Sequence, residues 1–217
     1  AIRRGAQAEL DIDPDELVVG LQPRRRGETR TAAIYVADAL ENGAGYALEL
    51  GGSRIEGVLN QIVSVVGTQW STARHRECDS SCPDCLRSWD NRNLHSLLDW
   101  RLALDVAEVA QGRDLNLARW FDLVPTAVTN FEHAFQESFQ HTYKVEKIDQ
   151  VHVLTHGQRS VVIGHPLWSR NPNTFSTLQR TTMNEVLSQG RTIYWSDARA
   201  LRTRPATVAG LLLNETL

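Results

Sequence analysis

The chain has 217 residues and a formal net charge of −3. That length can bury one large core or two small ones without covalent staples, and the acidic balance excludes adsorption to nucleic acid by the surface as a whole. No stretch approaches the roughly 18 apolar residues that a membrane span needs, and no signal segment opens the chain. The only methionine is Met183, so we expect a fragment or a processed form of a longer protein.

Two apolar, β-branched stretches near the start predict a hairpin. They are ELVVGLQ, residues 16–22, and TAAIYVA, residues 31–37, and the PRRRGETR between them contains the turn formers Pro23 and Gly27. This turn brings together four arginines: Arg24, Arg25, Arg26 and Arg30. One interpretation is a solvated turn. The other is a tip that contacts phosphates, because guanidinium groups suit phosphate oxygens.

A glycine-rich turn, NGAGY at residues 42–46, separates the second strand from a helix predicted over about 46–66, which Gly51 and Gly52 interrupt. Its glycines can serve backbone packing through positive φ, or they can form a phosphate cradle at a helix N-terminus. The turn lacks the Lys-Ser/Thr of a Walker A loop, so we favour packing. The buried stripe of the helix is predicted to consist of Ile55, Val58, Leu59, Ile62 and Val66.

All three cysteines lie within eight residues, as Cys78-x3-Cys82-x2-Cys85. An odd number of closely spaced cysteines does not make a disulfide framework, but thiolates at this spacing can close around one zinc ion. The alternative is three reduced cysteines that bind nothing. Structural zinc takes four ligands. For the fourth ligand His95 is the favoured candidate, and His75 is the other.

The stretch from Leu94 to Gly112 predicts a helix of about four turns with a broad buried face, which Gly112 ends. His95 would lie in the first turn and point back toward the cysteines. Zinc would then fasten a loop to the start of a core helix. That is a folding role, with no open coordination position implied.

Beyond Gly112 the pattern predicts a second, smaller α/β module. A linker ending at Pro125 leads to a short helix, capped by Thr129 or Asn130, whose phenylalanines at 131, 135 and 139 are expected in the core. VHVLTH and SVVIGHPLW then predict a hairpin around GQR. A helix ending at Gly190 and a further strand, RTIYWSD, complete the module.

That arrangement is similar in shape to the core of restriction-endonuclease-like nucleases. Such enzymes hold a divalent metal with an acidic residue and an acid-x-lysine on adjacent strands, whereas residues 160–163 offer neither a carboxylate nor a lysine. The histidines at 152, 156 and 165 cannot replace the oxygen ligands of magnesium. We therefore expect a module that is nuclease-like in shape at most and catalytically empty, or an unrelated α/β module.

The stretch CDSSCPDCLRSWDNRNLHSLLDWRLALD, residues 78–105, resembles the cysteine-rich signature of the MrfA-like zinc-binding region. That region lies at the C-terminal end of superfamily 2 DNA helicases of DNA repair and of anti-phage systems such as DISARM and Druantia. DIDPDELVVGL and AAIYVADALENGAGYALEL also resemble this family, so the likeness covers about residues 10–110. Many members have a fourth cysteine where this chain has Asn91, and others have the form seen here, with Asn91 and His95.

The resemblance implies a non-catalytic accessory module of a DNA helicase, with one structural Zn²⁺ on Cys78, Cys82, Cys85 and His95. We expect an α+β or α/β fold with a zinc-stabilised domain over residues 1–112 and an α/β module over residues 113–217. ATPase motifs are absent from this sequence.

The partners implied are the parent helicase core, subunits of a repair or defence complex, and DNA. The DNA would be single-stranded or forked, and the isolated chain would bind it weakly. We expect a cytoplasmic location and no membrane partner. Two other functional classes remain open. One is a zinc-stabilised scaffold for protein–protein interaction, and the other is a nuclease domain.

Overall fold

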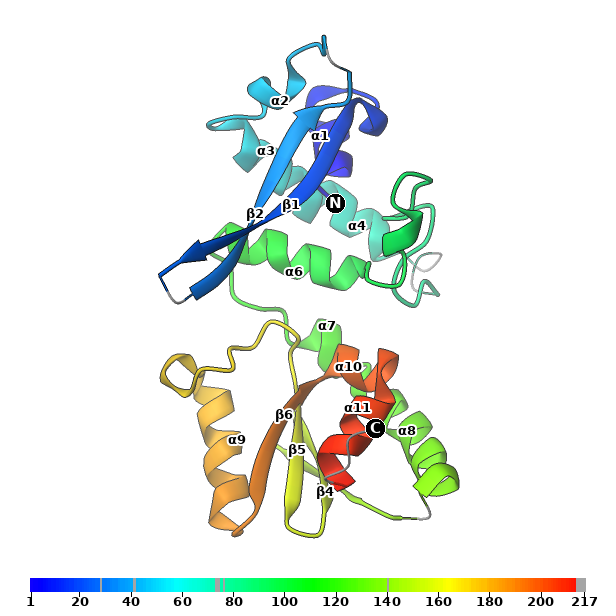
Figure 1. The fold of residues 1–217 in the computed structure, drawn as a ribbon, viewed down its shortest axis with the longest axis vertical. Coiled ribbons are helices and arrows are strands. Elements are labelled where there is room, and N and C mark those ends of the chain that lie inside the picture. Colours follow the sequence, from blue (N-terminus) through cyan, green and yellow to red (C-terminus); the bar gives the residue numbers. More distant parts are fainter. Residues whose placement is uncertain (28, 41, 73–74, 76, 140, 214–217) are drawn as a thin grey trace. The chain divides into compact units, whose positions relative to one another are not determined.

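The structure, a computed structural model, describes residues 1–27, 29–40, 42–72, 75, 77–139 and 141–213. The chain divides into two compact units, Ala1–Leu115 and Asn116–Leu217, against an expected boundary at 112/113 (Figure 1). Both units combine helices with a sheet, so the expected mixed fold class is confirmed. Among the described residues, no helix has the length and apolar character needed to cross a membrane.

The core of unit 1 lies between its first helix and a long helical segment. The elements are α1 (Ile2–Leu10), α3 (Arg54–Gln61), a π-helical turn η2 (Ile62–Val66) and α4 (Gly67–Trp70). Val58, Ile62 and Val66 are buried, as the apolar stripe predicts. α1 approaches closely because Gly5 has no side chain: a Cβ there would lie 2.7 Å from the carbonyl oxygen of Val58.

A two-stranded antiparallel ribbon leaves this core, as the sequence predicts. It consists of β1 (Leu17–Arg26) and β2 (Thr29–Asp38). Leu17, at its base, is buried, whereas Leu21 and Ile34, paired further out, are 69% and 51% exposed. The turn is shorter than predicted, because residues 24–26 are the last positions of β1 and not part of a wide loop. The basic end of the ribbon therefore lies away from the hydrophobic core (Figure 1).

Asp38, the last residue of β2, caps the glycine-rich turn that leads into α2 (Tyr46–Glu49). Its carboxylate accepts hydrogen bonds from the backbone N–H groups of Gly45, at 3.1 Å, and Ala47, at 2.9 Å. Gly45 has a φ of 84°, which favours glycine. These contacts support the packing interpretation, since the carboxylate occupies N–H groups that a bound phosphate would need.

The helix predicted around His95 begins later than expected. α6 spans Trp100–Ala110, and the Asp99 carboxylate caps it by accepting from the backbone N–H of Arg101 at 3.0 Å. Asp99 is itself extended, with φ −145° and ψ 120°, so the helix cannot continue back to His95. The predicted C-terminal stop is confirmed, because Gly112 has a φ of 74°.

Unit 2 contains a four-stranded mixed sheet in the order β3-β4-β5-β6. β4 is antiparallel to both β3 and β5, and β6 runs parallel to β5. The strands are β3 (Lys144–Ile148), β4 (Val151–His156), β5 (Arg159–Gly164) and β6 (Thr192–Asp197). The helices are α7 (Ala118–Phe121), α8 (Val124–Phe139), α9 (Thr177–Ser188), α10 (Ala198–Thr203) and α11 (Pro205–Leu213).

The predicted hairpin of β4 and β5, the helix that ends before Gly190, and the strand after it are all confirmed. α8 differs from the prediction: it starts at Val124, so Pro125 lies in its first turn, where a helix tolerates proline. The linker therefore ends before Pro125, and neither Thr129 nor Asn130 is the N-terminal cap of the helix. Phe131 and Phe135 are buried, as expected of core residues.

Candidate metal centre

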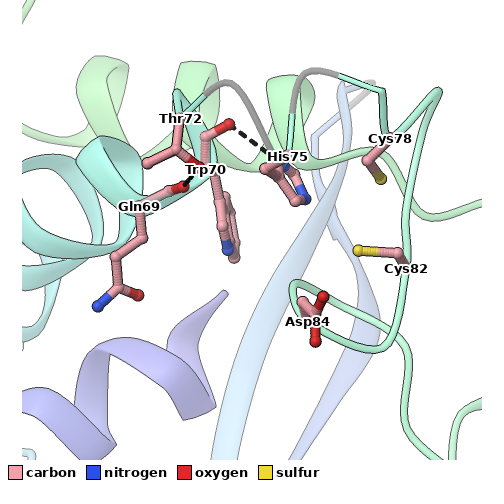
Figure 2. A pocket seen from close by; sticks show the side chains of 7 residues that line it. All are labelled: Gln69, Trp70, Thr72, His75, Cys78, Cys82 and Asp84. Atoms are coloured by element: carbon pink, nitrogen blue, oxygen red, sulfur yellow. Dashed lines mark hydrogen bonds between the residues drawn. The ribbon is translucent and has the colours of Figure 1, made fainter.

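Four side chains of unit 1 converge: His75, Cys78, Cys82 and Cys85. One ligand atom from each lies within 4.8 Å of all the others. Figure 2 shows the sulfur atoms of Cys78 and Cys82 beside the imidazole of His75. The sulfurs of Cys82 and Cys85 are 3.7 Å apart. Zn–S distances of about 2.3 Å in tetrahedral geometry require an edge of ~3.8 Å. The donor set and its spacing therefore fit one structural zinc ion.

The backbone around the last two cysteines forms a tight turn that presents both sulfurs on one side. The carbonyl oxygen of Cys82 accepts from the N–H groups of Cys85, Leu86 and Arg87, at 3.1, 3.1 and 3.0 Å. The N–H of Cys82 in turn donates to the sulfur of Cys85 at 3.1 Å. An N–H that donates to sulfur favours the thiolate, which is the form that binds zinc.

The thiols are otherwise hard to ionise. Burial raises the pKa of Cys78 to about 12, and the neighbouring Cys85 adds to that rise. Burial also raises the pKa of Cys85, an effect that the backbone N–H of Cys82 partly opposes. Three negatively charged thiolates in one partly buried cluster repel one another. A coordinated Zn²⁺ would supply the positive charge that allows them to lose their protons.

His75 is oriented as a ligand by a hydrogen bond on the far side of its ring. Its Nδ1 lies 2.8 Å from the carbonyl oxygen of Trp70, so Nδ1–H donates and the lone pair is left on Nε2 (Figure 2). That Nε2 is buried and has no hydrogen-bond partner among the described residues. Metal-binding histidines show this arrangement, with one ring nitrogen tied to a carbonyl and the other free for the metal.

Two buried tryptophans enclose the His75 ring. Trp70 stacks on it with ring centroids 6.2 Å apart, and Trp100 meets it edge-on at 5.2 Å. A cavity of about 390 Å³ opens beside the cluster. The residues that line it are Gln69, Trp70, Thr72, His75, Cys78, Cys82 and Asp84 (Figure 2). The tryptophan rings thus shield one side of the cluster from water, and the cavity leaves another side accessible to solvent.

The loop that carries Cys78 is fastened to the start of α6. The backbone N–H of Trp100 donates to the carbonyl of Ser80 at 2.9 Å, and its indole N–H donates to the carbonyl of Cys78 at 3.2 Å. The guanidinium of Arg101 donates to the carbonyl of Asp79 at 2.6 Å. The loop with the cysteines and the core helix are therefore connected through the first turn of α6.

The structure places His75, and not the favoured His95, with the three cysteines. The Nε2 of His95 lies 3.1 Å from the carbonyl oxygen of Ser88, and His95 is outside the four-residue cluster. Its different position follows from the late start of α6. The sequence does contain a signal for His75: its spacing to Cys78 repeats the C-x2-C spacing of Cys82 and Cys85, and two such pairs can close a tetrahedral site.

The four hairpin arginines lie on the ribbon and not at the metal cluster. Arg24 and Arg25 are exposed, and the side chain of Arg25 donates to the carbonyl of Gly27 at 3.3 Å. In the ladder Arg26 is paired with Thr29, and Arg30 with Arg25. The side chains of Arg26 and Arg30 lie outside the described part of the chain.

In unit 2 the one acidic side chain of β3 is held in an ion pair. Both oxygens of Glu146 accept from the guanidinium of Arg191, at 2.7 and 2.9 Å. Hydrogen bonding to Arg191 lowers the pKa of Glu146. β5, from Arg159 to Gly164, has no carboxylate. The described part of the sheet therefore offers no acidic pair on adjacent strands of the kind that a nuclease would need around magnesium.

Comparison with known proteins supports the metal centre. Residues 1–86 match the family model of the MrfA Zn-binding domain, so the resemblance seen in the sequence is confirmed over that segment. The segment contains all four clustered residues and ends before His95. The Druantia protein DruE of Escherichia coli (strain UMEA 4076-1) is 30% identical over 104 residues, which are 47% of this chain and 5% of DruE. The match thus spans about a twentieth of that relative's length. No solved structure matches the chain.

Proposed function

We propose that the chain is a non-catalytic, zinc-stabilised accessory module of a DNA helicase, and that it helps the helicase to engage nucleic acid during anti-phage defence. The observation that carries this proposal is the Cys3His cluster inside the segment that matches the MrfA Zn-binding domain. The similarity to DruE, a Druantia protein, favours defence over repair. Reduced, metal-binding cysteines suit a cytoplasmic location.

The ligand set supports a structural role for the zinc. The three thiolates and one imidazole would supply all four ligands of a structural zinc ion, which would leave no coordination position for a substrate or a reactive water. The site lies where two loops meet the start of α6, and its ligands contact core tryptophans. Zinc is therefore placed to hold unit 1 together, and any contact with a partner must come from other surfaces.

The ribbon of β1 and β2 is the surface that best suits nucleic acid. The chain is net acidic, yet four arginines gather at the outer end of this ribbon. Its outer pairs stand clear of the core, as the exposed Leu21 and Ile34 show. A narrow, cationic projection can reach phosphates that the acidic body of the protein would repel.

Changing Arg24, Arg25 and Arg26 together to alanine is expected to weaken binding to single-stranded or forked DNA. Each arginine that neutralises a phosphate releases counterions, so the slope of log affinity against log salt should fall by up to about three phosphate equivalents. The measurement is a salt titration of the wild type and the variant on one labelled oligonucleotide.

The matched control removes three exposed arginines elsewhere: Arg113, Arg180 and Arg204. This control has the same net charge as the ribbon variant, so it should lose far less affinity. If the two triple variants behave alike, or if the ribbon variant retains the wild-type affinity and slope, the ribbon is an ordinary solvated hairpin and DNA is contacted elsewhere or not at all.

A protein–protein scaffold is the second candidate, and the apolar side chains on the ribbon favour it. Leu21, Ile34 and Tyr35 are 69%, 51% and 50% exposed. A partner protein could cover them, or pair with an edge of the ribbon. Capture of a defence-complex subunit in the absence of DNA, lost on changing Leu21 and Ile34 to serine, would favour this candidate. For the nuclease alternative, the described strands of unit 2 offer no acidic pair on adjacent positions.

A further inference from the structure

Trp89 is exposed to solvent to an unusual degree. Its exposed fraction is 80%, whereas the other five tryptophans of the chain are buried or half-buried. An indole is a large apolar surface, and leaving it in water forfeits the stabilisation that its burial would provide. Such a side chain on a rigid segment is a common feature of recognition surfaces.

The backbone around Trp89 is held firmly, although its ring is not covered. Asn91 bridges the loop: its side-chain oxygen accepts from the N–H of Ser88 at 3.0 Å, and its amide donates to the carbonyl of Leu86 at 2.9 Å. The ring Nε2 of His95 lies 3.1 Å from the carbonyl oxygen of Ser88. These contacts give Asn91 and His95 a role outside the metal cluster.

The residue that follows Trp89 is anchored as well. The carboxylate of Asp90 accepts from the hydroxyl of Ser88 and, at 2.7 Å, from the guanidinium of Arg3 on α1. The segment that carries Trp89 begins just after Cys85, so it starts at the zinc turn. The indole is thus presented by a short loop that is fixed before and after it.

Arg92 covers one part of the Trp89 ring. The central carbon of its guanidinium lies 4.5 Å from the ring centroid, which is a cation–π contact. Because the residue as a whole is 80% exposed, much of the ring remains open to solvent. The residues next to it in sequence are all polar: Ser88, Asp90, Asn91 and Arg92. The next exposed large apolar side chains along the chain are Leu94 and Leu97.

We propose that Trp89 and Arg92 form a stacking platform for one unpaired nucleobase. Asn91 and His95 hold the loop that carries this platform in position. The inference rests on the proposed engagement of nucleic acid, and adds a second contact to that of the ribbon arginines. A flat base can stack on the open part of the indole, while the Arg92 guanidinium attracts the adjoining phosphate. An exposed aromatic ring with a cation against it and polar sequence neighbours suits a flat, polar and anionic ligand better than it suits the apolar core of a protein interface.

The test uses the zinc-loaded full chain and two labelled oligothymidylates of about 12 nucleotides, one intact and one with abasic sites in the middle. Trp89→Ala should weaken binding to the intact oligonucleotide about fivefold or more, which is the effect of losing one stacked base. Trp89→Phe should remain within about threefold of the wild type because it keeps an aromatic face. On the abasic oligonucleotide, wild type and Trp89→Ala should bind equally.

Two further measurements separate stacking from other causes. The salt slope of Trp89→Ala should equal that of the wild type, because stacking releases few counterions. Leu48→Ala is the matched control: Leu48 is another large apolar side chain of unit 1, 86% exposed, and its loss should leave the affinity unchanged.

Asn91 is tested as a positioning residue. Asn91→Ala should weaken binding to the intact oligonucleotide while zinc content and affinity for the abasic oligonucleotide stay at wild-type values. Asn91→Asp keeps the acceptor for the Ser88 N–H but loses the donor to Leu86, so its affinity should be intermediate. Loss of zinc or of all DNA binding in Asn91→Ala would contradict a positioning role.

The outcomes distinguish the platform from the proposed function. If Trp89→Ala binds the intact oligonucleotide as well as the wild type does, while the ribbon variant is weakened, the platform is overturned and nucleic-acid engagement stands. The exposed Leu94 and Leu97 nearby in the sequence would then mark this loop as a protein contact. If the wild type binds neither oligonucleotide, both the platform and nucleic-acid engagement by this module are overturned.

Discussion

Changing His75 to alanine is expected to remove zinc from the chain, whereas the same change at His95 should leave about one zinc per molecule. His75 lies with the three cysteines and has a buried, unpartnered Nε2, while the Nε2 of His95 faces the carbonyl of Ser88. Loss of a hydrogen bond behind a ligand already costs ~10–100-fold in metal affinity, so loss of the ligand itself should cost more.

The measurement is elemental analysis of each purified variant, followed by competition with a chromophoric chelator. His133→Ala is the matched control, because His133 is an exposed histidine of unit 2. The wild type and this control should both contain about one zinc. A folded wild type with less than a tenth of an equivalent would refute the metal centre. Zinc lost from His95→Ala and retained in His75→Ala would restore His95 as the ligand.

Changing Cys82 to serine is expected to unfold unit 1 or to lower its thermal midpoint strongly. The apparent free energy of binding structural zinc is about 10–16 kcal/mol in small zinc modules, and part of it is folding free energy. Whole domains are stable by only about 5–15 kcal/mol, so losing this contribution is a large fraction of the total. Cys82 is at the centre of the turn, since its carbonyl accepts three backbone N–H groups and its sulfur lies 3.7 Å from that of Cys85.

Hydrogen exchange followed by mass spectrometry can localise this effect. Protection should fall in α4 and α6, whose Trp70 and Trp100 contact the His75 ring, and should persist in β4 and β5 of unit 2. A chelator added to the wild type should reproduce the pattern, and should change Cys82→Ser little further. Full protection of unit 1 in the metal-free variant would show that its apolar core is sufficient without zinc.

Several elements were predictable because they depend on residues close together in the chain. The β-branched and apolar content of residues 16–22 and 31–37 predicts the ribbon of β1 and β2, and the apolar period predicts the buried stripe of Val58, Ile62 and Val66. Gly112 and Gly190 end their helices in the left-handed conformation that glycine adopts at little cost. The three cysteines indicate zinc by spacing alone, since two or three intervening residues suffice for a turn.

The fourth ligand, in contrast, depends on where a helix begins. The apolar pattern from Leu94 onward continues without a break, so periodicity extends the helix back to His95. The capping carboxylate of Asp99 starts α6 at Trp100 instead, and leaves His95 in a turn that faces Ser88. The cap favours a helix start at Trp100, whereas the apolar pattern would also allow an earlier start. Trp100 packs against His75 and donates to the carbonyl of Cys78, and these contacts support the later start.

The ribbon, the turn that holds the cysteines and the mixed α/β unit follow from the amino-acid sequence, because each rests on spacing, turn chemistry or periodicity within a few residues. Three other contacts emerge from tertiary packing: His75 lies with the cysteines, the Asp38 carboxylate caps the glycine turn, and Arg191 pairs with Glu146. Each of these contacts is chosen by burial and hydrogen bonding in the assembled core, where an unpaired polar group is costly, and sequence spacing does not encode that choice.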